Sequence, residues 1–166
     1  MTGPSVKFSV IVLAGQRPGT DPVAEARGVK AKALAPVAGR AMILNVLDAL
    51  EASPWVGDVY ITLEDPKLSE AEPRLMAYAE TGHIVQGTGT ICGSVLSAVE
   101  TRDIKTPFLV VTADHALLTA DMLDHFCEDA AGLRGGETGF PVWRGLRKIV
   151  PPRLPLRHQN LSRFPG

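Results

Sequence analysis

The chain has 166 residues, of which 45% are apolar, and a formal net charge of −1. That length suits one domain of ordinary size, and the apolar fraction is sufficient to build a core. No run approaches the roughly 20 apolar residues of a membrane span, and the opening MTGPSVK lacks the pattern of a signal peptide. Cys92 and Cys127 do not have CxxC spacing, which argues against a disulfide framework or a zinc site. We therefore expect a cytoplasmic protein with free thiols and no membrane partner.

Apolar runs with branched side chains alternate along the chain with segments of helical spacing. The first run, VKFSVIVLAG, is mostly apolar and ends in glycine, which is typical of a central parallel strand. Three later runs are also expected to be strands, because they are short and rich in residues of high β propensity. The four expected strands are residues 6–15, 56–65, 83–87 and 106–114.

Four further segments carry helix signals. In the second segment, Ser69 is the candidate N-cap and Gly82 the stop signal. Pro73 makes the start of this helix uncertain, because a helix tolerates proline only near its start. Thr119 is the candidate N-cap of the last segment. The expected helices are residues 41–53, 69–82, 93–102 and 119–132.

This alternation predicts a three-layer α/β/α fold with a mainly parallel sheet. In such a sheet the strand C-termini meet at one edge, and ligands bind there. Three unusual segments follow expected strand C-termini, so we expect them to converge on that edge. They are AGQRPG, QGTGT and TADHA.

The first of these segments is rich in small residues. Small residues let the backbone approach a ligand, so that its N–H groups can hold phosphate oxygens. The residues that would do so are Leu13, Ala14, Gly15, Gln16, Arg17 and Gly19. The segment is neither a Walker A loop nor a Rossmann fingerprint, because GxxxxGK[ST] and GxGxxG are both missing. A purely structural turn is the alternative.

Basic side chains accumulate in the loop that follows. Lysine neutralises phosphate as a compact point charge, whereas arginine binds it through two parallel hydrogen bonds. Lys32 precedes the apolar ALAPV, which constrains its position, while Arg27 and Lys30 are expected on a solvated surface. We interpret residues 20–31 as a mobile flap rather than as a set of ligands.

Asp114 ends the apolar strand FLVVTAD, so its carboxylate is expected to face the ligand edge. Mg²⁺ prefers one or two carboxylates together with phosphate oxygens and water, which makes Asp114 the candidate metal ligand. A turn or N-cap aspartate is the alternative, although Thr119 already fills the cap position. Ser94 follows the glycine-rich turn QGTGT and lies near the start of the helix expected over residues 93–102. It could equally cap that helix or contact a ribose or base.

Together these segments resemble the GT-A-type nucleotidyltransferases with a Rossmann-like sheet, among them the molybdenum cofactor guanylyl- and cytidylyltransferases. Their signature LAxGxxxR, followed by K-x-L-x-P-x-x-G-[RK], is similar to LAGQRPG and then KALAPVAGR, which begins at Lys32. Their glycine-rich turn into a Ser-Val helix resembles GTGTICGSVLSA, and their strand-end aspartate motif resembles ADHALLT. The resemblance covers about residues 7–131.

The resemblance implies an Mg²⁺-dependent enzyme that transfers NMP from a nucleoside triphosphate to a phosphorylated small-molecule acceptor and releases pyrophosphate. It implies that Arg17 and the backbone of residues 14–19 hold the triphosphate. Lys32 would stabilise the α-phosphate region, and Asp114 would hold Mg²⁺. The base and ribose would be lined by Gln86, Gly89 and Ser94. Neither the base nor the acceptor is identified by the sequence.

The chain departs from this family at Gln16, where a second glycine is common, and at Ala41, which replaces a proline. Residues 132–166 hold seven Lys and Arg against one acidic residue, which leaves ten against seventeen for residues 1–131, and they carry five of the thirteen prolines. We therefore divide the chain into a nucleotidyltransferase-like domain, 1–131, and an atypical basic segment, 132–166. Truncation or a frame shift after about residue 131 is one hypothesis for this shift.

Two other interpretations stay open. The chain would be a non-catalytic nucleotide-binding module if it lacks a complete acceptor site. A basic tail can also contact nucleic acid, but this one has few interleaved aromatic residues, so we expect no nucleic-acid partner. Assembly as a homodimer is left open.

Overall fold

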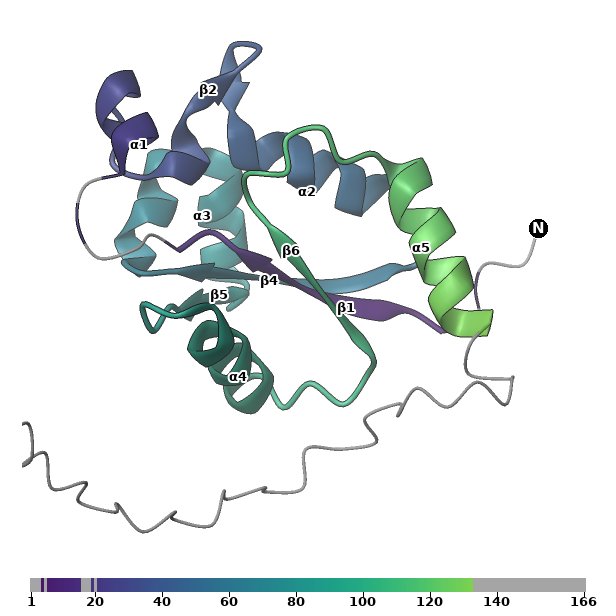
Figure 1. Cartoon of the computed structure of the whole chain (residues 1–166). Helices are drawn as coiled ribbons and strands as arrows, with labels where there is room; N and C mark the ends of the chain where they lie inside the picture. Colours follow the sequence, from purple (N-terminus) through teal and green to yellow (C-terminus); the bar gives the residue numbers. More distant parts are fainter. Residues whose placement is uncertain (1–3, 5, 16–18, 20, 133–166) are drawn as a thin grey trace, which may run out of the picture.

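The computed structural model describes residues 4, 6–15, 19 and 21–132 (Figure 1). A four-stranded parallel sheet lies at the centre of this part of the chain, in the order β5-β4-β1-β6. Its strands are β1 (Phe8–Leu13), β4 (Val56–Leu63), β5 (Ile84–Gln86) and β6 (Phe108–Thr112). Each strand lies within the range expected from the sequence.

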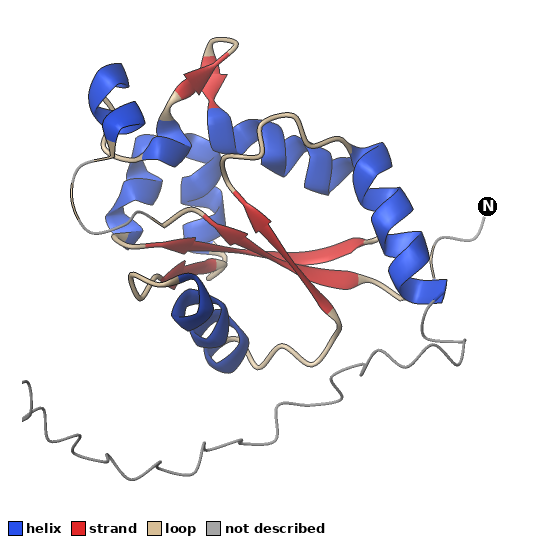
Figure 2. Ribbon diagram, in the orientation of Figure 1, coloured by secondary structure: helices blue, strands red, loops and turns tan. Residues whose placement is uncertain are grey.

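Helices cover both faces of the sheet, which confirms the expected three-layer α/β/α architecture (Figure 2). Three of them lie on one face, and α4 lies on the other. The helices are α2 (Met42–Ala52), α3 (Pro73–Glu80), α4 (Ile91–Thr101) and α5 (Ala120–Gly132). None of the described helices is long and apolar enough to cross a membrane.

The core is divided unevenly between the two faces of the sheet. On one face, side chains of β1 and β4 pack against the apolar stripe of α2, in which Leu47 and Leu50 are fully buried. On the α4 face, the buried cluster is small and consists of Ile11, Val85 and Ala98. Because successive residues of a strand point to opposite faces, β1 contributes to both clusters. We expect Leu47→Ala to cost about 2–5 kcal/mol, since it leaves a cavity in the larger core.

The strand order reverses beside β1. The chain passes from β1 outward to β4 and β5 and then returns to place β6 on the other side of β1. Leu13 is in register with Thr62 of β4 and Thr112 of β6, so the three strands end level with one another. The N–H of Ala14 donates to the Thr62 carbonyl (3.1 Å), and the N–H of Ala113 donates to the Leu13 carbonyl (2.9 Å). In open α/β sheets, ligands bind in the crevice outside the strand ends at such a reversal.

The segment interpreted as a flap contains a short helix that the sequence analysis did not expect, α1 (Pro22–Arg27), while its mobility stays a prediction. The Asp21 carboxylate caps the helix and accepts from two backbone N–H groups of the first turn at 2.8 and 3.1 Å. Gly28 ends the helix in the left-handed conformation, at φ 63°. An aspartate cap, proline at the first helical position and glycine after the last are ordinary helix signals.

A tight connection leads from α1 to α2. It consists of a 3₁₀ turn, η1 (Lys32–Leu34), and a short antiparallel hairpin of β2 (Pro36–Val37) and β3 (Arg40–Ala41). The two residues between these strands, Ala38 and Gly39, both have positive φ values, 49° and 83°. Positive φ at both central residues matches the twist of a two-residue hairpin, but it is unfavourable for alanine.

The expected helix over residues 69–82 is divided by Pro73. α3 begins at Pro73, where a helix needs no N–H, and its N-cap is Glu72 rather than Ser69. Ser69 belongs instead to a preceding 3₁₀ helix, η2 (Pro66–Ala71), in which its hydroxyl donates to a backbone carbonyl at 2.7 Å. The N-cap prediction for Ser69 is therefore wrong, while the one for Thr119 is confirmed by its hydroxyl accepting from the first turn of α5 at 3.3 Å.

Candidate active site

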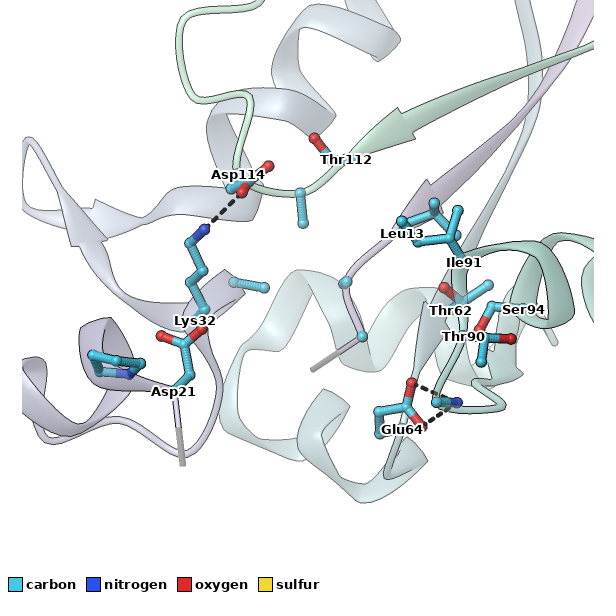
Figure 3. A pocket seen from close by; sticks show the side chains of 16 residues that line it. Leu13, Asp21, Lys32, Thr62, Glu64, Thr90, Ile91, Ser94, Thr112 and Asp114 are labelled. Atoms are coloured by element: carbon cyan, nitrogen blue, oxygen red, sulfur yellow. Dashed lines mark hydrogen bonds and ion pairs between the residues drawn. The ribbon is translucent and has the colours of Figure 1, made fainter. Parts of the chain in front are cut away.

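A cavity of about 650 Å³ lies at the carboxyl ends of β1, β4 and β6 (Figure 3). Its walls also include the start of α1, the η1 turn and the glycine-rich turn before α4. All three segments predicted to converge on this edge contribute to it, and its size suits a small-molecule ligand. Of the residues predicted for the site, those that line the cavity are Leu13, Ala14, Gly15, Lys32, Gly89, Ser94 and Asp114.

Lys32 and Asp114 meet at one end of this cavity (Figure 3). The Nζ atom of Lys32 donates to Oδ2 of Asp114 at 2.7 Å, although the two residues are 82 positions apart. Ala31 and Ala33 are buried on either side of the lysine, so they anchor η1 and leave the longer side chain to reach across the cavity. The two side chains remain 37% and 45% exposed, and a ligand can therefore reach both.

The ion pair also lowers the pKa of Asp114. The hydrogen bond from Lys32 is the main cause that lowers the pKa of Asp114 below its usual value of 3.8, and the Thr112 side chain adds to it. Partial burial opposes this shift. Asp114 is therefore an ionised carboxylate at neutral pH, directly beside a cation.

This donor set can be compared with what a metal ion needs. Among residues 21–132 and the other described positions, no group of three or more His, Cys, Asp and Glu is gathered to hold a metal. Asp114 is thus a single carboxylate in an accessible cavity. Mg²⁺ characteristically takes one or two carboxylates and completes its shell with water and substrate phosphates. The residues present fit an ion that arrives with a phosphate ligand, and not an ion held in a cage of protein side chains.

Glu64 occupies another part of the cavity, and sequence reasoning missed it. It follows β4 directly, and both of its carboxylate oxygens accept from the N–H of Gly89, at 3.2 and 3.1 Å. A Cβ atom added at Gly15 or at Gly87 would lie only 2.7 Å from Oε1 of Glu64. These glycines therefore permit the backbone to close around the carboxylate.

The glycine-rich turn is held by two hydroxyl groups. Thr90 is the N-cap of α4, and its hydroxyl accepts from the N–H of Gly93 at 3.1 Å, so α4 begins two residues earlier than expected. Ser94 is 4% exposed, and its hydroxyl accepts from the N–H of Thr88 at 3.1 Å. Ser94 thus fastens the turn from inside the helix and is not its cap, although its residue still lines the cavity.

Several predicted site residues do not lie in the cavity wall. The side-chain amide of Gln86 donates to the backbone carbonyl of Glu64, so it supports the turn from outside. Gly19 is exposed and is not among the residues that line the cavity, and Arg27 and Lys30 are exposed, as expected from the sequence. Gln16 and Arg17 fall outside the described residues. Their proposed ligand roles stay predictions.

The missed residue had one signal in the sequence. Glu64 is an acidic residue near the end of the expected strand 56–65, and Glu64 and Asp114 each lie two residues beyond the residue that pairs with Leu13. A search of every strand C-terminus for titratable residues would have found it. Its glycine surroundings could not have been found in this way, because Gly15, Gly87 and Gly89 come from two different segments.

A parallel sheet with this order, an accessible lysine–aspartate pair and a glycine-lined pocket at one edge are features of the GT-A-like nucleotidyltransferase class. The sequence model of the MobA-like NTP transferase domain matches residues 10–158, which is most of the chain. The chain therefore belongs to the MobA-like NTP transferase domain family. The match extends into the basic segment, 132–166. The domain boundary after residue 131 stays a prediction.

Solved structures of related proteins agree with the fold. A hypothetical transferase from Thermus thermophilus is 31% identical, with a TM-score of 0.55 over 76% of this chain and 47% of that one. A cytidylyltransferase from Leptospira borgpetersenii is 16% identical, with a TM-score of 0.56 over 78% of this chain and 51% of that one. CMP:2-keto-3-deoxy-manno-octonic acid synthetase, complexed with CTP, is 18% identical, with a TM-score of 0.52 over 78% and 48%.

The chain spans about half the length of each of these solved proteins. At under 20% identity, the two named cytidine enzymes share the fold and carry no further argument. No curated protein matches the chain.

Proposed function

We propose that the chain transfers NMP from a nucleoside triphosphate to a phosphorylated small-molecule acceptor, with release of pyrophosphate and with Mg²⁺ as the metal. The observation that carries this proposal is the Lys32–Asp114 pair at the β1–β6 edge of the sheet, in a cavity large enough for a nucleotide. Membership of the NTP transferase family supports the reaction class.

This reaction requires electrostatic stabilisation of its transition state. An acceptor oxygen attacks the α-phosphorus in line with the departing pyrophosphate, so negative charge must be held in position at the moment of reaction. Lys32 supplies a compact cation on an anchored turn, and that preorganisation is what lowers the barrier. The backbone at Ala14 and Gly15 lines the same cavity as this lysine, and Gly15, which is exposed, can approach phosphate oxygens. Arg17 would add a second cation.

Asp114 would be the protein ligand of Mg²⁺. When bound, the ion would neutralise phosphate charge and polarise the α-phosphoryl group. In the ligand-free chain the Asp114 carboxylate instead satisfies Lys32. Nucleotide phosphates would compete for the lysine, and this exchange would leave the carboxylate to its metal role.

A non-catalytic nucleotide-binding module is the second candidate. It is the alternative that the sequence leaves open if the acceptor site is incomplete. Such a module would bind nucleotide through the same cavity without completing the transfer.

Two measurements, made one after the other, distinguish these two functions. Titration calorimetry of the full chain with each NTP and Mg²⁺ should detect saturable binding, and a pyrophosphate-release assay with a panel of phosphorylated sugars and alcohols should then detect turnover. Binding without release by any acceptor would favour the module. Absence of binding would contradict both functions.

A further inference from the structure

The hairpin of β2 and β3 follows the turn that carries Lys32 and projects from the fold beside α2 (Figure 1). At its base, the N–H of Met42 donates to the carbonyl of Ala35, the residue after η1, at 2.9 Å. A two-stranded hairpin is at best marginally stable by itself, and the positive φ of Ala38 works against this one. A displacement of the hairpin would reach η1 through Ala35, so the position of Lys32 depends on what fixes the hairpin.

The side chain of Arg40 connects the hairpin to two helices. Its Nη1 atom donates to Oδ2 of Asp48 in α2 at 2.6 Å. Oδ1 of the same carboxylate accepts from Nη1 of Arg74 in α3, and Nη2 of Arg74 pairs with Oε1 of Glu51 at 2.8 Å. One carboxylate therefore joins the hairpin to both α2 and α3.

The chemistry of this junction suits a tether that is present at neutral pH. The hydrogen bonds from Arg40 and Arg74 are the main causes that lower the pKa of Asp48 below its usual value of 3.8, so its carboxylate is ionised. Both bonds are charge-assisted, which makes them stronger than bonds between neutral groups. In the hairpin sequence PVAGRA, residues 36–41, only Arg40 has a side chain that can form a hydrogen bond. The tether therefore depends on this residue.

From this geometry we propose that Arg40, held by Asp48, is a positioning residue for Lys32. It fixes the carboxyl end of η1 by tying the hairpin to α2, while the buried Ala31 and Ala33 fix the turn itself. The described residues that line the cavity do not include Arg40, so it acts through Lys32 and not by contact with a ligand. A misplacement of about 1 Å can cost a reaction about 10²-fold in rate. The inference rests on the proposed function, because it requires Lys32 to meet developing charge.

The test compares the two arginines that share Asp48. Arg40→Met and Arg74→Met each remove one guanidinium group and keep an unbranched side chain. We expect Arg40→Met to lower kcat about tenfold in the pyrophosphate-release assay with a smaller change in KM, because the loss falls on a group aligned for the transition state. Arg74→Met leaves the Arg40–Asp48 bond in place and should keep kcat near the native value. It should nevertheless lower the midpoint of urea denaturation further than Arg40→Met does, since Arg74 contacts both Asp48 and Glu51.

Two further variants address the Arg40–Asp48 bond itself. Arg40→Lys keeps a charged donor for Asp48 and should recover most of the native kcat. Asp48→Asn weakens the same bond from the other side and should lower kcat as Arg40→Met does, which keeps the test open if Arg40→Met does not fold. Asp103→Asn is the matched control, because it breaks an exposed ion pair with Lys105 in another part of the chain.

A readout independent of turnover is the hydrogen exchange of the backbone amides in η1 and at the base of the hairpin. The amides of Leu34, Ala35 and Met42 should exchange faster in Arg40→Met than in Arg74→Met or the Asp103→Asn control. A native kcat in Arg40→Met, or an equal fall of kcat in Arg40→Met and Arg74→Met, would overturn the positioning role and leave the proposed function intact. No turnover by the native chain with any acceptor would overturn the proposed transfer reaction and the positioning role together.

Discussion

The two ends of the cavity are built in different ways. At one end, Lys32 and Asp114 come from distant segments and meet through flexible, partly exposed side chains. At the other end, Glu64 is enclosed by backbone, with Gly15, Gly87 and Gly89 around its carboxylate. The first end is an ion pair that a polyanion can open, and the second is a fixed acceptor.

The difference assigns different tasks to the two ends. A partly exposed ion pair contributes little to stability, so its members can exchange partners at small cost. A carboxylate against glycine backbone cannot move without disturbing the turn before α4. We infer that the Lys32 end can adapt to the charge of a ligand, while the Glu64 end keeps its shape.

The largest expected effect comes from removing the cation at the adaptable end. Lys32→Ala should lower turnover at least 10²-fold in the pyrophosphate-release assay, because a positioned charge at developing negative charge is worth about that much. Its circular dichroism should stay native, since the lysine side chain is partly exposed. Lys67→Ala, an exposed lysine in η2, is the matched control and should keep full activity. Near-normal turnover of Lys32→Ala would remove it from the reaction.

The next effect should come from crowding the fixed end. In Gly87→Ala, the new Cβ would lie 2.7 Å from the carboxylate and 3.3 Å from the backbone nitrogen of Glu64, so the turn must shift. We expect a loss of about 1–3 kcal/mol in the free energy of unfolding. Gly132→Ala, where an added Cβ meets nothing within 4 Å, is the control for urea denaturation. If Gly87→Ala behaves like this control, the enclosure of Glu64 is wrong.

A third change should affect neither end. Ala38 has φ 49° in the hairpin between η1 and α2, and Gly lacks the Cβ that makes this conformation costly. Ala38→Gly should therefore raise the free energy of unfolding by about 1 kcal/mol, a value that the greater entropy of unfolded glycine reduces. Nucleotide affinities should not change, because Ala38 does not line the cavity. Destabilisation in urea would contradict the strain at this turn.

The smallest effect is the pH dependence of the Lys32–Asp114 pair. The folded-state pKa of Asp114 lies below its usual value of 3.8, so the pair stabilises the fold above that pH and this contribution is lost as the pH falls through the lowered pKa. The amount should be under about 1 kcal/mol, because both side chains are more than a third exposed. Urea denaturation of the native chain and Asp114→Asn should show a difference at about pH 7 that shrinks at about pH 3. A difference that is equal at both pH values would mean that the pair does not stabilise the fold.

The sheet could be predicted because its signals are local. Each strand is a short apolar run, and parallel topology then brings Gly15, Gly89 and Asp114 to one edge without any knowledge of contacts. Lys32 was found through its spacing from an apolar segment and through the family resemblance. These inferences needed only the order of elements along the chain.

Three features could not be predicted: α1, the start of α3 and the enclosure of Glu64. They depend on competing local signals or on contacts between distant segments. Asp21, Pro22 and Gly28 are helix signals, but α1 is only six residues long and its apolar periodicity is too short to notice. α3 begins at Pro73 and not after Ser69, because a helix accepts proline at its first position. The enclosure of Glu64 depends on how closely two loops approach each other, which spacing along the sequence does not encode.

The account is tested most directly by a crystal structure of the full chain with Mg²⁺ and a nucleoside triphosphate analogue whose α,β linkage cannot be hydrolysed. We predict phosphate oxygens within hydrogen-bonding distance of Lys32 Nζ, with Asp114 released to the metal. A nucleotide bound outside the β1–β6 edge, or one bound there with the Lys32–Asp114 pair still closed, would contradict it.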